Sequence, residues 1–214
     1  MGRAHSAVPL GHRTADPAVV PRVQACYESR GLTPVFRIPE RPAFDAVRQR
    51  LRAAGYGATQ PTLTMTGLLP GAAATPRDVG TVCLAGSPGD GWSNVFLGEG
   101  FDPVDGESRL GLLRRARQSV FASIEQGGEV VAVGSACFAH GWCGIHGMRT
   151  APAWRGRGFA SAILASLARE AAAQGLSRAF LQVEMKNAAA RSLYRRAGLK
   201  DAWVYEYWRR PGPA

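Results

Sequence analysis

The sequence predicts an α/β (α+β) protein with a mixed central sheet and flanking helices. Residues 142–173 read as an apolar strand, a glycine-rich turn and an apolar-periodic helix. Residues 179–198 repeat the order of strand and helix, and residues 120–139 read as a hairpin. Strand-to-helix units combined with a hairpin are typical of a sheet that mixes parallel and antiparallel neighbours under layers of helices.

The first part of the chain predicts a smaller α/β subdomain over residues 1–70. We expect strands at 4–10, 34–38 and 62–66, and helices near 17–30 and 42–54. The run from Pro70 to Pro76, PGAAATP, is dominated by proline, glycine and alanine. Such composition is typical of a connection, so residues 71–80 are expected to be a linker before a main domain over residues 81–214.

The sequence of the main domain predicts strands and helices that together form one sheet with flanking helices. We expect a strand at 81–84, helices near 90–97 and 107–117, and a hairpin of 120–125 and 130–139 around the turn QGG. A strand at 142–150 leads to a helix at 156–173, whose buried stripe is Phe159, Ile163, Leu164, Leu167, Ala168 and Ala171. A strand at 179–184, a helix that begins after Asn187 and stops at Gly198, and a strand at 202–208 complete the domain.

Composition narrows the class of protein. The 214 residues carry a formal net charge of +10, and nearly all of the positive charge is arginine. A basic chain favours an anionic partner. No apolar run reaches the roughly 18 residues of a membrane span, and the first ten residues lack the apolar core of a signal peptide, so we expect a cytoplasmic protein without a membrane partner. The four cysteines form no C-x-x-C pair, so no metal site is expected.

A nucleic-acid partner is not favoured, because the sequence contains no RNP, zinc-finger or helix-turn-helix signature and its aromatic residues do not interleave with the arginines. The sequence leaves a homodimer open.

The most informative motif is RGRGFA, from Arg155 to Ala160, which reads R-x-x-G-x-A at the start of a helix. The first turn of a helix has unpaired N–H groups and a favourable dipole for anions, and glycine lets a phosphate come close. A P-loop is excluded because the chain has no Gly-Lys pair. A dinucleotide motif fits less well, because Ser161 occupies its last position and no acidic residue follows about 20 residues later.

A second motif follows from Asn187 to Leu199, reading N-x-x-A-x-x-L-Y-x-x-x-G-L. Together with Pro152 and the arginine-glycine motif, it resembles the GNAT superfamily of N-acetyltransferases over about residues 129–208. The resemblance implies the GNAT fold, acetyl-CoA as co-substrate, and direct transfer of acetyl to a primary amine in a ternary complex. The alternative is a non-catalytic module that binds or senses acyl-CoA.

The resemblance also implies roles for individual residues. The backbone N–H groups of Arg155, Gly156, Arg157, Gly158, Phe159 and Ala160 would hold the pyrophosphate. The strand edge at Met148, Arg149 and Thr150 would align the pantetheine arm, with Asn187 as a further contact and a backbone N–H near Met148 polarising the thioester carbonyl. Tyr194 would protonate the departing thiolate; its other interpretation is a core residue with a tethered hydroxyl.

The general base has two candidates. His146 precedes Met148 on the same strand, and a period of two predicts that it shares a face with Met148 and Thr150. Its ordinary pKa of about 6.5 suits the task. Glu184, on the neighbouring strand, is the other candidate. Each also has a structural interpretation: a hydrogen-bonded core histidine, and a glutamate paired with an arginine.

The acceptor is a small molecule or a protein amine that the sequence does not identify. The aromatic residues that could line its site, or belong to the core, are Trp92, Trp142, Tyr205, Tyr207 and Trp208.

One short internal repeat relates the two parts of the chain. The motif Y-x-x-x-G-L occurs at Tyr27–Leu32 and again at Tyr194–Leu199. One interpretation is that residues 1–70 are a truncated, degenerate GNAT-like half, as in tandem acetyltransferases. The other is coincidence, because this pattern is common where helices end.

Overall fold

The computed structural model describes residues 5–69, 79–98 and 102–211. The chain divides into two compact units. Unit 1 comprises Met1–Thr64, Val183–Ala188 and Asp201–Ala214, and unit 2 comprises Met65–Gln182 and Ala189–Lys200. Unit 1 therefore draws its strands from both ends of the chain.

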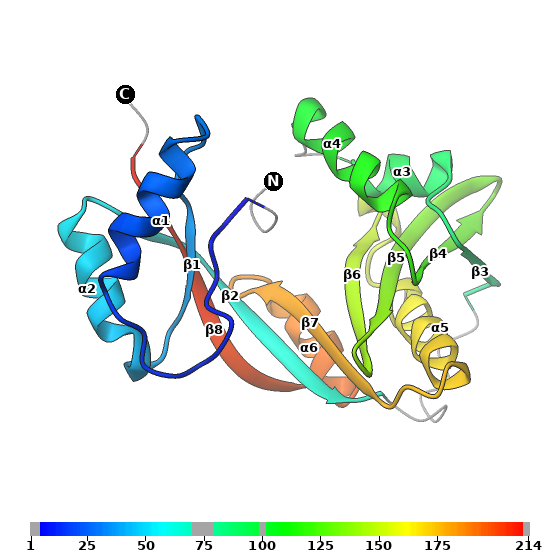
Figure 1. Cartoon of the computed structure of the whole chain (residues 1–214). Helices are drawn as coiled ribbons and strands as arrows, with labels where there is room; N and C mark the ends of the chain where they lie inside the picture. Colours follow the sequence, from blue (N-terminus) through cyan, green and yellow to red (C-terminus); the bar gives the residue numbers. More distant parts are fainter. Residues whose placement is uncertain (1–4, 70–78, 99–101, 212–214) are drawn as a thin grey trace. The chain divides into compact units, whose positions relative to one another are not determined.

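The described strands form one mixed sheet in the order β1-β8-β2-β7-β6-β5-β4-β3. β6 and β7 pair in parallel, whereas β3, β4, β5 and β6 pair antiparallel in sequence, as do β1 and β8. The expected mixed α/β architecture is confirmed. The strands, labelled in Figure 1, are β1 Phe36–Pro39, β2 Gly57–Leu68, β3 Val82–Ala85, β4 Ser119–Gln126, β5 Glu129–Ala139, β6 Trp142–Thr150, β7 Arg178–Glu184 and β8 Lys200–Arg209.

The helices follow the predicted positions with shifts at their ends. They are α1 Val19–Glu28, α2 Asp45–Ala53, α3 Asp90–Phe96, α4 Pro103–Arg114, α5 Phe159–Ala173 and α6 Ala188–Arg196. α4 begins four residues earlier than expected, because Pro103 is well suited to a first helical turn and the side chain of Asp102 accepts the N–H of Asp105.

The segments expected at residues 4–10 and 71–80 differ from the other predicted elements. The strand expected at residues 4–10 is wrong: in its described part, only Ala7 forms a single parallel bridge, to Phe36. One bridge fixes too few backbone hydrogen bonds to define a strand. The expected linker falls largely outside the described residues, which resume at residue 79.

Unit 1 packs α1 and α2 against β1 and β8 around one apolar cluster. The cluster contains Val20, Phe36, Ile38, Phe44, Val47, Leu51, Tyr56 and Trp208. Trp208 is fully buried and comes from the last strand, so the C-terminal strand completes a core built mainly from residues 20–56. Burying a side chain of this size contributes on the order of 3 kcal/mol or more of stability.

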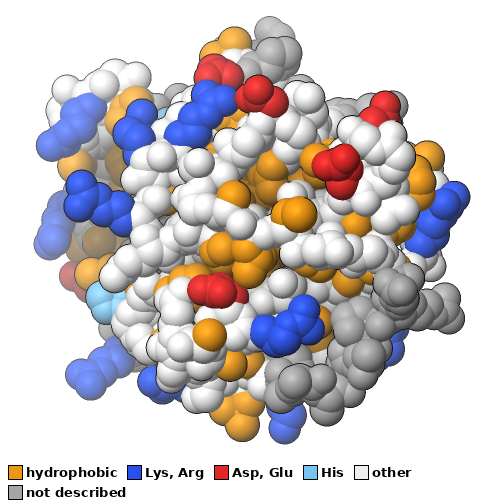
Figure 2. Space-filling view, turned by 90° about the vertical axis from the view of Figure 1, so that its right-hand side faces the viewer, with side chains coloured by type: hydrophobic (Ala, Val, Ile, Leu, Met, Phe, Trp, Pro, Cys, Tyr) orange, Lys and Arg blue, Asp and Glu red, His pale blue; other side chains and the backbone are white. Residues whose placement is uncertain are grey.

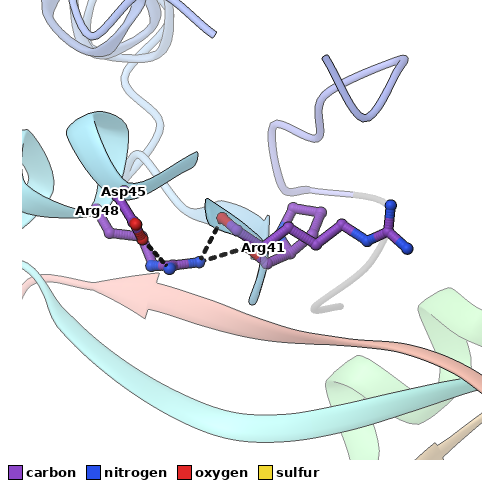
Figure 3. A network of polar contacts seen from close by, with 4 residues as sticks. Arg41, Asp45 and Arg48 are labelled. Atoms are coloured by element: carbon purple, nitrogen blue, oxygen red, sulfur yellow. Dashed lines mark hydrogen bonds and ion pairs between the residues drawn. The ribbon is translucent and has the colours of Figure 1, made fainter. Parts of the chain in front are cut away.

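A polar network joins the end of β1 to α2 (Figure 3). Arg48 donates from Nη1 to the carbonyl oxygens of Pro39, at 2.8 Å, and Arg41, at 3.3 Å, and it pairs with the carboxylate of Asp45. The side chain of Arg41 points away from the network. Each of these carbonyl oxygens also accepts a backbone N–H, from Arg41 and from Phe44 respectively, so the guanidinium adds a second hydrogen bond to each.

Unit 2 covers its antiparallel strands with helices. One apolar cluster joins Trp92 of α3 and Leu110 of α4 to Phe121 of β4 and Val133 of β5. On α5, all six residues of the predicted stripe are buried, which confirms that stripe. None of the helices within the described ranges is long and apolar enough to cross a bilayer.

α5 begins at Phe159, three residues later than predicted. Gly156 and Gly158 have φ of +77° and +98°, which lie outside right-handed helical geometry. The RGRG segment is therefore a loop that ends in the helix, with Gly158 as the residue before its first turn.

Gly134 of β5 creates the space in which α5 meets the sheet. A Cβ at this position would lie 2.5 Å from Sδ of Met148 and 2.6 Å from Cγ2 of Ile163. Ile163 is fully buried and branched at Cβ, so it has little freedom to move. The face of β5 that carries Gly134 is therefore the one on which α5 packs.

We expect Gly134→Ala to destabilise the protein by about 1–3 kcal/mol, because overpacking a close-packed interior forces strained side-chain positions. Gly57→Ala is the matched control, since a Cβ on that strand glycine meets nothing within 4 Å. Urea unfolding followed by circular dichroism measures both. Equal midpoints for the two variants would show that the Met148–Ile163 contact yields without cost.

Candidate active site

A β-bulge in β6 shapes the centre of unit 2. Val133 of β5 pairs with Arg149, but Ser135 pairs with His146, so one residue of β5 faces two residues of β6. Gly147, one of the two, has φ of +62°. A left-handed glycine is the usual way to accommodate the extra residue of a bulge. The bulge therefore interrupts the alternation of side chains along β6.

The bulge corrects the prediction that His146 shares a face with Met148 and Thr150. Directly paired residues in a sheet point to the same side. His146 and Arg149 pair with Ser135 and Val133, on the face where α3 packs, which we call the α3 face. Thr150 pairs with Ala132 on the opposite face, where the side chain of Met148 contacts the Gly134 position beside α5. His146 and Met148 thus project to opposite sides of the sheet.

The side chain of Arg149 has a structural role. Its Nη1 donates to the carbonyl oxygen of Phe96 at 2.6 Å and to that of Gly98 at 3.3 Å. These carbonyls lie at the end of α3, where the helix leaves acceptors unsatisfied and favours a cation. Burial, followed by the charge of Arg155, lowers the pKa of Arg149. The guanidinium thereby ties the end of α3 to the strand beside the bulge.

The parallel pairing of β6 with β7 is short. It joins Cys143, Gly144 and Ile145 to Ala179, Phe180 and Leu181. β6 continues to Thr150, and in the part of the chain that the structure describes its register with β7 extends no further than Ile145. Residues 146–150 therefore lie beyond that register, and they include the predicted pantetheine residues Met148, Arg149 and Thr150.

The loop before α5 has the geometry of an anion site. Within the described residues, the N–H groups of 156–160 donate to no backbone carbonyl. The ring of Trp154 contacts two residues of this loop. Its centroid lies 4.8 Å from Cζ of Arg157 and 5.8 Å from the ring centroid of Phe159. Arg155 reaches back to the carbonyl oxygen of Thr150 at 3.3 Å. Free donors, a helix N-terminus and two exposed arginines together favour a polyanionic ligand.

Tyr194 lies on α6 and only 7% of its surface is exposed. Burial raises the pKa of its hydroxyl to about 12, so the group keeps its proton at neutral pH. Asn187 precedes α6, and its N–H donates to the carbonyl oxygen of Glu184 at 2.9 Å. Asn187 belongs to unit 1 and Tyr194 to unit 2, so the structure does not place these two predicted residues relative to one another.

Glu184 is engaged by two neighbours within unit 1. Its Oε1 accepts from Nε2 of Gln60 at 2.8 Å, and its Oε2 lies 3.1 Å from Nζ of Lys186. The Gln60 hydrogen bond and then Lys186 lower the pKa of Glu184, against an opposing effect of burial. The carboxylate is thus ionised and a weaker base than an ordinary glutamate, and its ion-pair partner is a lysine where the sequence predicted an arginine.

Two features of this region were not predicted from the sequence. One is the bulge, although an isolated glycine within an apolar strand is its usual signal. The other is the row of rings on the α3 face, in which Phe180 lies 5.9 Å from His146 and 6.3 Å from Trp142. That row depends on strand register, which a single sequence does not reveal.

Comparison with solved structures confirms the GNAT fold. A GCN5-related N-acetyltransferase from Kribbella flavida matches with a TM-score of 0.68 at 18% identity, covering 96% of this chain and 81% of that one. A tandem GNAT protein from the clavulanic acid biosynthesis pathway matches with a TM-score of 0.62 at 12% identity, covering 92% and 70%. A GCN5-related N-acetyltransferase from Sphaerobacter thermophilus matches with a TM-score of 0.61 at 24% identity, covering 85% and 62%. At these identities the likeness concerns the fold.

The family model described as "Probable histone acetyltransferase Rv0428c C-terminal" matches residues 1–208. The chain belongs to this family. A comparison with curated proteins gives no match.

We expect Arg149→Gln to destabilise the protein by about 1.5–3 kcal/mol, because a charged donor to the partly buried carbonyl oxygens at the end of α3 is lost. The control is Arg169→Gln, an exposed arginine on α5. Thermal or urea unfolding of the two variants checks the difference. A loss no larger than that of the control would mean that the tether to α3 contributes nothing to stability.

Proposed function

We propose that the protein is an acyltransferase that moves an acetyl group from acetyl-CoA to a primary amine. The observation that carries the proposal is the combination, within unit 2, of a donor-rich loop at the start of α5 with a bulged strand that continues past its last β7 partner. One feature suits the pyrophosphate of CoA and the other suits its extended pantetheine arm. Membership of an acetyltransferase family and the GNAT fold support this function.

The loop would bind the pyrophosphate through backbone groups. The N–H groups of residues 156–160 have no backbone acceptor in the described chain, and Arg155 and Arg157 supply positive charge. Backbone donors at a helix start bind phosphate without requiring a side chain, and the left-handed glycines allow the close approach.

The strand edge would hold the pantetheine arm and polarise the thioester. Met148 and Thr150 lie past the last β7 partner, and their backbone groups would pair with the amide groups of the arm. A bulge leaves an extra residue outside the regular ladder. A backbone N–H at the Gly147–Met148 bulge is therefore the natural donor to the carbonyl oxygen on which charge develops.

His146 is the better candidate for the base. It stands on the α3 face at the first position beyond the β6–β7 pairing, whereas Glu184 is ionised and already bonded to Gln60 and Lys186. The amine would lose one proton to His146 as its nitrogen attacks the carbonyl carbon. The carbon–sulfur bond then breaks, and the thiolate takes a proton from Tyr194, whose hydroxyl is protonated at neutral pH.

The family model is described as a probable histone acetyltransferase, so a protein amine is one class of acceptor, and a small-molecule amine is the other. On the face that Figure 2 shows, several lysine and arginine side chains gather toward the left edge, and the others lie singly among hydrophobic and uncharged ones. A cytoplasmic location, a homodimer, the contact of Asn187 with pantetheine and a degenerate half over residues 1–70 stay predictions.

Calorimetric titration with acetyl-CoA tests the binding step. We expect saturable binding by the wild type, and binding weakened at least about tenfold by Arg155→Glu combined with Gly158→Trp, because a charged phosphate contact is lost and the loop is blocked. Gly158→Ala provides a milder change, and Gly175→Ala is its control, since that glycine also has a positive φ, of +74°, but lies beyond the other end of α5.

Wild-type protein that does not bind acetyl-CoA would refute the proposed function. Equal weakening by Gly158→Ala and Gly175→Ala would instead show that backbone strain, and not the loop, controls binding.

Tyr194→Phe tests the acid. We expect the turnover number to fall about 10²- to 10⁴-fold while the Kd for acetyl-CoA stays constant, because the hydroxyl acts only when the thiolate departs. The control is Tyr27→Phe, which changes the tyrosine at the same place in the repeated Y-x-x-x-G-L motif. Release of free thiol from acetyl-CoA in the presence of an amine is the measurement. Unchanged turnover in Tyr194→Phe would remove Tyr194 from the mechanism.

A further inference from the structure

Three rings form a row on the α3 face of unit 2. Phe180 of β7 lies between Trp142 and His146 of β6, at centroid distances of 6.3 Å and 5.9 Å. The ring planes meet at 75° and 77°, the edge-to-face arrangement that is favourable for aromatic pairs. All three side chains are only partly buried. The row is therefore ordered by its own contacts and still presents apolar surface.

Strand register explains why the row exists. Gly144 pairs with Phe180, and Trp142 and His146 lie two residues to either side of Gly144, so all four positions share one face. A Cβ on Gly144 would lie 2.8 Å from Cζ of Phe180 and 3.1 Å from Nε2 of His146. The missing side chain thus lets the Phe180 ring and the His146 imidazole come together over the strand.

A cation closes the end of the row farther from His146. Cζ of Arg178 lies 4.9 Å from the centroid of the Trp142 ring. Nη2 of Arg178 lies 3.1 Å from the Cβ position of Gly141, in the turn between β5 and β6. The guanidinium of Arg178 thus lies over the Trp142 ring. Because Arg178 is exposed, the guanidinium is also accessible to a ligand.

The distance from His146 to Arg178 along the row sets the length of a ligand that could contact both. Arg178 precedes Phe180 by two residues and therefore stands level with Trp142, four residues from His146 along the strand. Four strand residues span about 13 Å. A molecule lying along the rings would place one end at the imidazole of His146 and the other at the guanidinium of Arg178.

We propose that this row is the acceptor subsite, and that the acceptor is an amine carrying a flat apolar group and, at its far end, an anionic group. The inference rests on the proposed function, because it places the reacting nitrogen at His146. The rings favour the flat group, and Arg178 favours a carboxylate or phosphate over a second cation. The net charge of +10 acts in the same direction, since it attracts anions and repels polycations.

Three amines of one shape separate the contributions of the rings and of the charge. They are 4'-(aminomethyl)biphenyl-4-carboxylate, neutral 4-(aminomethyl)biphenyl and the dication 4,4'-bis(aminomethyl)biphenyl. Their length matches roughly three to four strand residues. Each is titrated into the full chain by calorimetry, with and without CoA, and acetyl transfer to each is measured separately.

We expect the wild type to bind the carboxylate most tightly, the neutral amine less tightly and the dication least. Arg178→Glu should weaken the carboxylate about tenfold and strengthen the dication, with little effect on the neutral amine, because an exposed ion pair contributes about two- to fivefold and reversal adds repulsion. Phe180→Ala should weaken all three about three- to tenfold. Arg52→Glu is the control: this exposed arginine also stacks on a ring, that of Trp208, at 5.2 Å, and its reversal changes the net charge equally.

Two results would overturn the proposal: no binding of any of the three amines, or equal effects of Arg178→Glu and Arg52→Glu on the order of affinities. Binding in the expected order without acetyl transfer would support the subsite and count against the proposed function, so the two conclusions fail separately.

Discussion

The bulge of β6 at Gly147 is the constraint on which the candidate site depends. A regular strand would carry His146, Met148 and Thr150 on one face, and the extra residue moves His146 to the other. Met148 and Thr150 then project toward α5, while His146 and Arg149 project toward α3. The same residue that breaks the alternation leaves a backbone group outside the ladder, so a single left-handed glycine separates the face of the strand that carries Met148 from the face that carries His146.

Two glycines determine the packing of this region as much as the larger side chains do. Gly134 lets Met148 and Ile163 meet over β5, and Gly144 lets Phe180 and His146 meet over β6. Close-packed interiors respond to the addition of one methyl group, so these glycines determine which larger side chains come together. Arg149 then joins the strand to the end of α3. α5 thus packs on one face of the sheet at the candidate site, and α3 packs on the opposite face.

Electrostatics divides the predicted residues into different roles. Tyr194 is buried and neutral, as a proton donor requires, whereas Glu184 is ionised and occupied by Gln60 and Lys186. The guanidinium of Arg149 donates to carbonyl oxygens at the end of α3. The side chains of Arg155, Arg157 and Arg178 are instead exposed and accessible to ligands. Residues of one chemical type therefore differ in function because their burial and their partners differ.

The sequence by itself determined the class of fold and the local elements with strong signals. The apolar stripe of α5, the hairpin of β4 and β5, and the bounds of β6 follow from periodicity and turn residues, which act over a few neighbours. The two motifs placed a glycine-rich loop before α5 and a tyrosine on α6. Only the tertiary structure decided the face of His146, the tether of Arg149, the partners of Glu184 and the ring row around Phe180. Each of these depends on register between strands that are distant in the chain, and a one-residue shift in register moves a side chain to the opposite face of the sheet.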